Sequence, residues 1–409
     1  NFIEKINSGT EFTISAKQIK KIGEREPRLM AKFDHYSNLP GLFKKNNIGI
    51  LPVSGSDFFL SKFNLYNKIE YPDEIRSIES HNLSEYETIS INDIKSEDKL
   101  IIVSDISRLL TDFTGEQELQ LTNRGKFGLG IFHFELETDF GIKKIANLGG
   151  QGELDSGFEG EKFYVFEAKL GKINDFNIRQ LYYPYKYWNH KIKKEVVPVF
   201  LTYFDKTFCF WEFKFKNPSQ FHSIELVRSM SYTFKDDTAI TKDILNIKTF
   251  KDSDPERVPF PQADDFEKVI DILDLIWAGI NTKSEFAEYF DFEPRQADYY
   301  FNAARYLELV DIEKNEIYLT ESGMKIVGEK RKKRHKFLIQ QILSRKVFYD
   351  TYQKIKGGKV IDTETIIEIM KQNKVLKGST DKMFGRRAQT VISWCRWIDQ
   401  RFKENKISF

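Results

Sequence analysis

The clearest pattern of apolar and polar positions lies in residues 152–169, GELDSGFEGEKFYVFEAK. A short polar strand is expected to end at Asp155, and a glycine-containing turn follows it. An apolar strand then leads to Glu167, Ala168 and Lys169. Because strand side chains alternate between faces, Glu167 and Lys169 are expected on one face and Ala168 on the other. If the two strands pair as a hairpin, the carboxylates and the ammonium converge at one edge of a sheet.

Further elements follow the hairpin in a regular order. The segment after Lys169 predicts an amphipathic helix that is capped at Asn174 or Asp175 and carries Gln180. Pro184 should kink this helix. Two apolar strands joined by a short turn come next. The predicted succession is therefore a helix or strand, two strands, a helix and two more strands.

The pattern changes to helical periodicity after a proline-containing linker. A helix is expected over Asp264–Ala278, a short helix after Thr282, a longer helix over 295–309, and then a hairpin closed at Lys314 and Asn315. This order indicates a winged helix-turn-helix. The third helix would then read DNA, and its candidate contacts are Arg295, Gln296, Tyr299 and Asn302. The alternative is a winged helix that serves only dimerisation or packing.

The end of the chain is strongly basic. Residues 329–409 hold 21 Lys and Arg against 8 Asp and Glu, a local charge of +13 in a chain whose net charge is +2. Such an asymmetry indicates a nucleic-acid partner, although a solvated lysine-rich surface would look the same. One long helix is expected over 330–355 and a last helix over 388–402. Candidate phosphate contacts are Lys332, Lys333, Arg334, Arg386 and Arg387.

Composition narrows the possible classes of protein. No apolar run approaches the length of about 18 residues that a membrane span needs. The two cysteines lie far apart, and the six histidines lack the H-E-x-x-H spacing of a zinc hydrolase. No phosphate-binding glycine loop or nucleophile elbow occurs either. We therefore expect a cytoplasmic protein with free thiols and no membrane partner.

The motif Asp155 with Glu167-Ala168-Lys169 resembles the PD-(D/E)XK nuclease superfamily, although Leu154 stands where the signature has proline. Together with PRLMAKFD, RQLYYPYKYW and RRAQTVISWCRWI, the pattern is similar to a group of bacterial type II restriction endonucleases. The resemblance implies an α/β (α+β) core that cleaves duplex DNA at a specific sequence with Mg²⁺, for which Mn²⁺ may substitute. It also implies that Asp155, Glu167 and the Ala168 carbonyl hold the metal and that Lys169 is the catalytic lysine.

Four further residues are candidates for accessory roles near this motif. In the superfamily an acidic residue upstream of the core strands often adds a metal ligand, and Glu135 or Glu137 could serve here. Glu153 and Gln180 match only by pattern. For Glu135 and for Glu137, a solvated surface carboxylate is at least as good an interpretation.

These observations predict four regions: an N-terminal recognition or accessory region over 1–125, a nuclease core over 126–250, a winged helix over 262–328 and a basic helical module over 329–409. The expected partners are double-stranded DNA and a cognate DNA methyltransferase without a stable complex, and a second copy of the chain if double-strand cleavage needs a dimer. Two hypotheses compete with the restriction enzyme: a non-catalytic winged-helix regulator, and a repair or junction nuclease on the same core.

Overall fold

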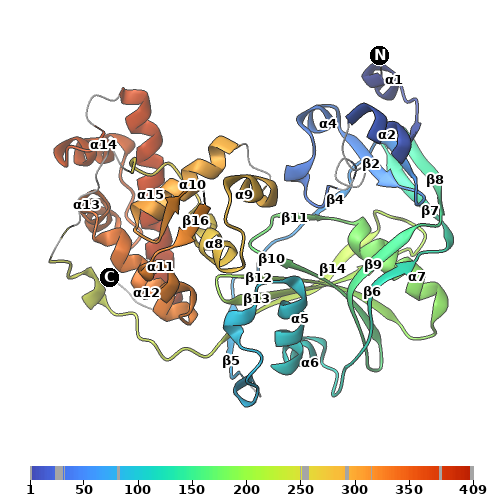
Figure 1. Cartoon of the computed structure of the whole chain (residues 1–409), viewed down its shortest axis with the longest axis horizontal. Helices are drawn as coiled ribbons and strands as arrows, with labels where there is room; N and C mark the ends of the chain where they lie inside the picture. Colours follow the sequence, from blue (N-terminus) through green and yellow to red (C-terminus); the bar gives the residue numbers. More distant parts are fainter. Residues whose placement is uncertain are drawn as a thin grey trace.

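The computed structural model describes residues 2–23, 31, 33–80, 83–248, 250, 258–290, 294–314, 316–376 and 380–405, without the side chains at 2, 22, 23, 93, 287–290 and 294–296. The chain forms two lobes (Figure 1). Residues 2–234 form a lobe that is built on a large sheet, and residues 240–405 form a lobe that is mostly helical. The expectation of a mixed α/β (α+β) chain is confirmed.

A seven-stranded mixed sheet is the centre of the first lobe. Its strands lie in the order β5 (Ile75–Ile78), β14 (Ile224–Phe234), β13 (Thr207–Phe215), β12 (Val196–Phe204), β10 (Phe163–Leu170), β9 (Gln151–Glu159) and β6 (Gln120–Gly128). Strands β9 and β10 form the predicted antiparallel hairpin, but β9 continues past its expected end at Asp155 to Glu159, where it still pairs with β10. Strand β10 pairs parallel with β12. The turn between β12 and β13 lies at Asp205 and Lys206, which both have positive φ.

Helices cover both faces of the sheet beside β10. Helices α5 (Glu97–Ile106) and α6 (Leu109–Thr114) pack on one face, where Phe166 and Ala168 share a core with Leu100. Helix α7 (Arg179–Lys191) packs on the other face, where Val165 shares a core with Tyr182. This alternation along β10 follows from the strand geometry, so it directs Glu167 toward the α7 side. Helix α7 runs through Pro184 without ending there.

A smaller unit precedes the sheet. Its elements are α1 (Phe2–Asn7), β1 (Phe12–Ser15), α2 (Ala16–Gly23), η1 (Tyr36–Asn38), α4 (Gly41–Asn46), β2 (Ile48–Pro52) and β3 (Asp57–Lys62). The residue pattern of Thr10–Lys21 predicts a single helix, but only its second half is helical, as part of α2. Residues 12–15 instead pair antiparallel with β3, because the alternating FTIS segment can bury one side against the three-stranded sheet.

Shorter elements connect this unit to the large sheet. They are β4 (Tyr66–Lys68), which pairs with β11 (Asp175–Asn177), the hairpin of β7 (Ile131–Thr138) and β8 (Gly141–Leu148), and the 3-10 helices η2 (Leu83–Glu85) and η3 (Ile91–Asp93). Strand β5 pairs with β14, and α5 packs on β10. A boundary at residue 125 would therefore divide one folding unit, because elements before it complete the large sheet.

The second lobe contains η4 (Lys242–Leu245), α8 (Phe266–Trp277), α9 (Lys283–Phe290), α10 (Pro294–Tyr306), β15 (Val310–Glu313), β16 (Glu316–Leu319), α11 (Glu321–Val327), α12 (Arg331–Leu343), α13 (Lys346–Ile355), α14 (Thr363–Gln372) and α15 (Asp381–Glu404). The succession from α8 to β16 is the order that the sequence predicts for a winged helix-turn-helix. Phe266 and Trp394 pack at 4.9 Å between ring centroids, within one core that also includes Leu338. Residues 262–328 and 329–409 therefore share a core and are not separate modules.

Two predicted helices have different bounds in the structure. The expected single helix over 330–355 is broken between α12 and α13 at Arg345, whose backbone is extended. The buried guanidinium of Arg345 donates to the Tyr306 carbonyl and to Glu308, and these contacts favour the break. The last helix begins at Asp381, seven positions before the predicted start at 388.

A buried charge cluster joins the lobes. Asp205 lies in the β12–β13 turn, and its side chain is only 4% exposed. Its carboxylate accepts a hydrogen bond of 2.6 Å from Nε2 of His335 and lies 3.3 Å from Arg331 and 4.0 Å from Arg334. Arg334 also donates to Asp274 of α8. The helical lobe is therefore docked on the sheet through compensated charges.

Candidate active site

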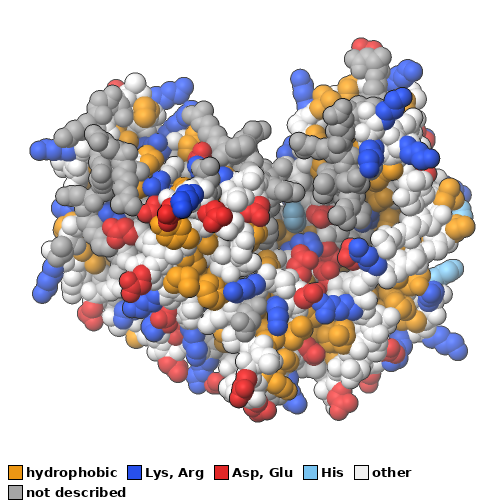
Figure 2. Space-filling model, in the orientation of Figure 1, with side chains coloured by type: hydrophobic (Ala, Val, Ile, Leu, Met, Phe, Trp, Pro, Cys, Tyr) orange, Lys and Arg blue, Asp and Glu red, His pale blue; other side chains and the backbone are white. Residues whose placement is uncertain are grey.

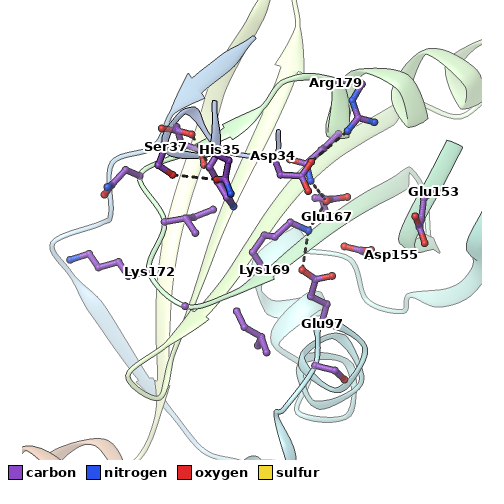
Figure 3. Close-up of a pocket in the computed structure, with 18 of the residues that line it drawn as sticks. Asp34, His35, Ser37, Glu97, Glu153, Asp155, Glu167, Lys169, Lys172 and Arg179 are labelled. Atoms are coloured by element: carbon purple, nitrogen blue, oxygen red, sulfur yellow. Dashed lines mark hydrogen bonds and ion pairs between the residues drawn. The ribbon is translucent and has the colours of Figure 1, made fainter. Parts of the chain in front are cut away.

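The hairpin of β9 and β10 opens into a cavity of about 960 Å³ between the two lobes. Figure 2 shows acidic and basic side chains gathered in the hollow at this place. Asp155, Glu167 and Lys169 line the cavity together, as the alternation along the hairpin predicts. Figure 3 shows these three side chains with those of the neighbouring elements.

The strand geometry brings the motif residues into direct contact. The β9–β10 register ends at the pair Phe166 and Ser156, so Asp155 lies just beyond the last paired position. Oδ2 of Asp155 accepts a hydrogen bond of 2.8 Å from the Ala168 N–H, in place of a continued ladder. Nζ of Lys169 donates to Oε1 of Glu167 at 2.7 Å and to the Ala168 carbonyl at 2.9 Å.

Glu97 is a site residue that the sequence reasoning missed. Nζ of Lys169 donates a hydrogen bond of 3.0 Å to Oε1 of Glu97, the first residue of α5. Ser96 caps this helix by accepting the Lys99 N–H. A serine followed by two acidic residues and then the apolar run 99–103 is the signal of a helix start, and it could have located Glu97.

Helix α7 contributes Gln180 to the same cluster. Nε2 of Gln180 donates a hydrogen bond of 2.6 Å to Oε1 of Glu167. The other amide atom, Oε1 of Gln180, is buried and has no hydrogen-bond partner within the described residues. Gln180 therefore orients Glu167 and leaves one acceptor atom in the cavity wall. Glu153 also lines the cavity, and its side chain is exposed.

Glu135 and Glu137 lie on β7, and neither lines the cavity. Oε2 of Glu135 accepts from Gln220, and the Glu137 N–H contacts the ring of His222. Glu97 is instead an upstream acidic residue in the cavity wall, because α5 rather than the β7 hairpin packs against β10.

Three carboxylates, those of Asp155, Glu167 and Glu97, lie around the single ammonium of Lys169, and this excess of negative charge shifts the pKa values of the cluster. Burial raises the pKa of Glu167 to about 8, and the charge of Asp155 adds to the shift. Burial also raises the pKa of Asp155 and of Glu97. For Lys169, burial alone would lower the pKa, but the carboxylates of Glu167, Glu97 and Asp155 outweigh it and hold the pKa well above its usual value. Lys169 is therefore an ammonium, and a second positive charge would stabilise the ionised carboxylates.

The donor set suits a hard divalent cation. No group of three or more His, Cys, Asp or Glu side chains in the described part of the chain forms a ready-made metal cage. Mg²⁺ however binds proteins through one or two carboxylates and completes its shell with water and substrate phosphate. Asp155 and Glu167 supply two such carboxylates, and the Ala168 carbonyl lies between them in the chain. The residues present therefore fit the ion implied by the resemblance.

The residues expected to contact DNA have different surroundings. The side chains of Arg295 and Gln296 lie outside the described residues. Tyr299 and Asn302 are half-buried on α10. Lys332 is half-buried on α12, whereas Lys333 is exposed and pairs with Glu329 at 2.8 Å. Arg386 is exposed on α15, and the neighbouring Arg387 is half-buried near Tyr299.

The assignment of Arg334 to phosphate contact was wrong. Its side chain is fully buried, with Nη1 3.0 Å from both carboxylate oxygens of Asp274. A basic run longer than one helical turn must direct some side chains inward, and on α12 the inward positions include Arg334 and His335. Arg334 therefore holds the lobes together.

Comparisons with known families divide the chain into three stretches. Residues 1–60, 61–233 and 268–403 match families described as domains of unknown function, DUF6996, DUF6997 and DUF7226 respectively. No curated protein and no solved structure matches the chain. The match over 61–233 contains Glu97 and the whole β9–β10 motif. Within the described residues, none of the helices combines the length and apolar character that crossing a membrane requires.

Proposed function

We propose that the chain is a Mg²⁺-dependent endonuclease with a PD-(D/E)XK core, and that it cleaves double-stranded DNA at a specific sequence as type II restriction endonucleases do. The observation that carries the proposal is the convergence of Asp155, Glu167 and Lys169 in one cavity, with Nζ of Lys169 2.7 Å from Glu167. A buried acid pair beside a lysine is costly to fold, and such perturbed groups are typical of functional sites.

In this proposal, Asp155, Glu167 and the Ala168 carbonyl would hold the Mg²⁺ ion. When bound, the ion supplies positive charge for the developing negative charge on the phosphate and makes water more acidic. Gln180 keeps Glu167 oriented through its hydrogen bond of 2.6 Å. Lys169 remains protonated, so it acts by orienting the attacking water and the phosphate rather than by removing a proton. Glu97 holds the other side of the ammonium.

The helical lobe would bind the duplex next to this site. The winged helix-turn-helix order of α8 to β16 supports a role for α10 in sequence reading, with Arg295, Gln296, Tyr299 and Asn302 as candidates. Lys332, Lys333, Arg386 and Arg387 remain candidates for phosphate contact. Mn²⁺ would substitute for Mg²⁺, a homodimer would cut both strands, and a cognate methyltransferase would protect host DNA without a stable complex.

Digestion of plasmid DNA by the purified chain with Mg²⁺ tests the proposal. Discrete fragments with mapped, repeated end sequences are expected, and the Glu167→Ala variant should yield none. Specific binding without any cutting would instead identify a winged-helix regulator. Nicking that depends on branches or lesions would identify a repair or junction nuclease.

A further inference from the structure

Cations other than Lys169 also line the cavity, and the proposed chemistry leaves Arg179 among them unused. Arg179 is the first residue of α7 and directly precedes Gln180, which holds Glu167. Its side chain is 15% exposed and lines the cavity with Lys169. In Figure 3 the guanidinium lies beside Asp34, on the opposite side of Lys169 from Glu97. Arg179 is thus within the same cavity as the motif residues, on the helix that orients one of them.

The hydrogen-bonding capacity of Arg179 is poorly used. Within the described residues, its guanidinium pairs only with Asp34, at 3.6 Å between Nη2 and Oδ1. This separation is longer than a hydrogen bond, and the Asp34 carboxylate is 46% exposed. A guanidinium offers several N–H donors in a planar fork that matches the oxygens of a phosphate. The pair is therefore weak enough for a phosphate to replace.

The backbone around Asp34 is held in place by contacts with β11. The Asp34 carbonyl accepts a hydrogen bond of 2.9 Å from the N–H of Asn177. On either side, the Phe33 carbonyl accepts from the amide of Asn177, and the Tyr36 N–H donates to Asp175. The N-terminal unit thus fixes Asp34 against β11, two residues before α7 begins. The charge of Asp34 also reaches the site, where it helps to raise the pKa of Glu97.

We propose that Arg179 is a phosphate-binding residue for the DNA strand in the cavity, and that Asp34 occupies its guanidinium in the free protein until a phosphate displaces it. This inference rests on the proposed nuclease function. It assigns the N-terminal unit a direct part in substrate binding, because the competing carboxylate comes from residue 34. Arg179 positions the strand beside Lys169, whereas Asp34 sets how readily the strand enters.

The test measures binding of the full chain to a short duplex in EDTA, where no cleavage occurs, as a function of salt. Arg179→Gln should weaken binding about tenfold and reduce the slope of log K against log salt by about one, as loss of a phosphate contact predicts. Asp34→Asn should tighten binding by up to roughly fivefold, the range of an exposed ion pair. Lys191→Gln removes a charge from the exposed far end of α7 and should leave the slope unchanged.

The double variant Asp34→Asn/Arg179→Gln tests whether Asp34 acts by occupying Arg179 or simply by repelling the DNA phosphates. If Asp34 acts by occupying Arg179, Asp34→Asn has no effect in the Arg179→Gln background. Tightening of the same size in both backgrounds would overturn the inference, as would an unchanged salt slope in Arg179→Gln. Wild-type cleavage with normal binding by Arg179→Gln would refute the role of Arg179 and leave the nuclease proposal standing. If the wild-type chain binds no duplex, both the role of Arg179 and the nuclease proposal are refuted.

Discussion

Lys169 and Glu97 are 72 positions apart in the chain, and Nζ of Lys169 donates a hydrogen bond of 3.0 Å to Oε1 of Glu97. The contact joins the end of β10 to the start of α5. Because Lys169 also binds Glu167 and the Ala168 carbonyl, Glu97 completes the set of oxygens that fixes the ammonium. The position of the proposed catalytic lysine thus depends on a helix outside the motif.

We predict that Glu97→Gln slows DNA cleavage about 10- to 100-fold, the usual effect of losing a supporting partner at such a site. The amide keeps the size of the side chain but removes the charge that faces Lys169. Single-turnover cleavage at saturating DNA measures the effect, and Glu137→Gln on β7 is the matched control because Glu137 is outside the cavity. Equal rates for wild type and Glu97→Gln would show that the contact only stabilises the fold.

Replacing the proposed metal ligands should abolish DNA cleavage without abolishing DNA binding. Asp155→Ala or Glu167→Ala should reduce cleavage by at least about 10³-fold, while DNA binding persists because phosphate neutralisation elsewhere provides most of the affinity. Lys169→Ala should lose cleavage but still bind Mg²⁺, which calorimetry of the three variants can distinguish. Cleavage at the wild-type rate by any of them would remove that residue from the proposed active site.

Arg334 and Lys333 are neighbours in the same basic run, but their replacement by alanine should have different effects on the free energy of unfolding. Arg334→Ala removes the hydrogen-bonded partner of Asp274 and one of the cations around the buried Asp205 carboxylate, which keeps His335 and Arg331, and it should cost about 3–5 kcal/mol of unfolding free energy. Lys333→Ala should leave stability nearly unchanged, since its pair with Glu329 is exposed at the lysine. Denaturant unfolding of the two variants gives the comparison. A stable Arg334→Ala protein with weakened DNA binding would reverse this assignment.

His335 should make stability depend on pH. Burial lowers its pKa to about 3, against the attraction of Asp205 and with repulsion from Arg331. Unfolding restores a pKa of about 6.5. Between these values only the unfolded state gains the proton, so this residue's contribution to stability is complete above pH 6.5 and falls as the pH drops.

The slope from this single group approaches about 1.4 kcal/mol per pH unit. The difference between wild type and His335→Gln isolates it, because Asp155, Glu167 and other buried carboxylates titrate in both proteins. Between pH 4 and pH 7, the free energy of unfolding should therefore change less with pH in His335→Gln than in wild type. A difference that stays constant across this range would mean that His335 takes up its proton at the same pH in the folded and the unfolded protein.

Local pattern predicted the part of the site that lies on one hairpin and the helix after it. Alternation along β10 was enough to place Glu167 and Lys169 on one face, and the helix after it brought Gln180 to Glu167. The helix-start signal before residues 99–103 could have marked Glu97 but could not have placed it beside Lys169. The contacts of Glu97 and of Asp34 join segments distant in sequence, which local pattern does not predict. The prediction for Arg334 was wrong because the net charge of a basic run does not tell which side of the helix faces the core.

The compensated cluster at Asp205 limits how the chain can be divided. Three basic side chains of α12 surround this carboxylate, and its pKa is held well below the usual value by His335, Arg331 and Arg334 despite complete burial. Truncation before the helical lobe would remove all three and leave a bare charge at the β12–β13 turn. An engineered sheet lobe therefore needs Asp205 replaced, and any transplanted lobe meant to change sequence preference must keep the basic residues of α12.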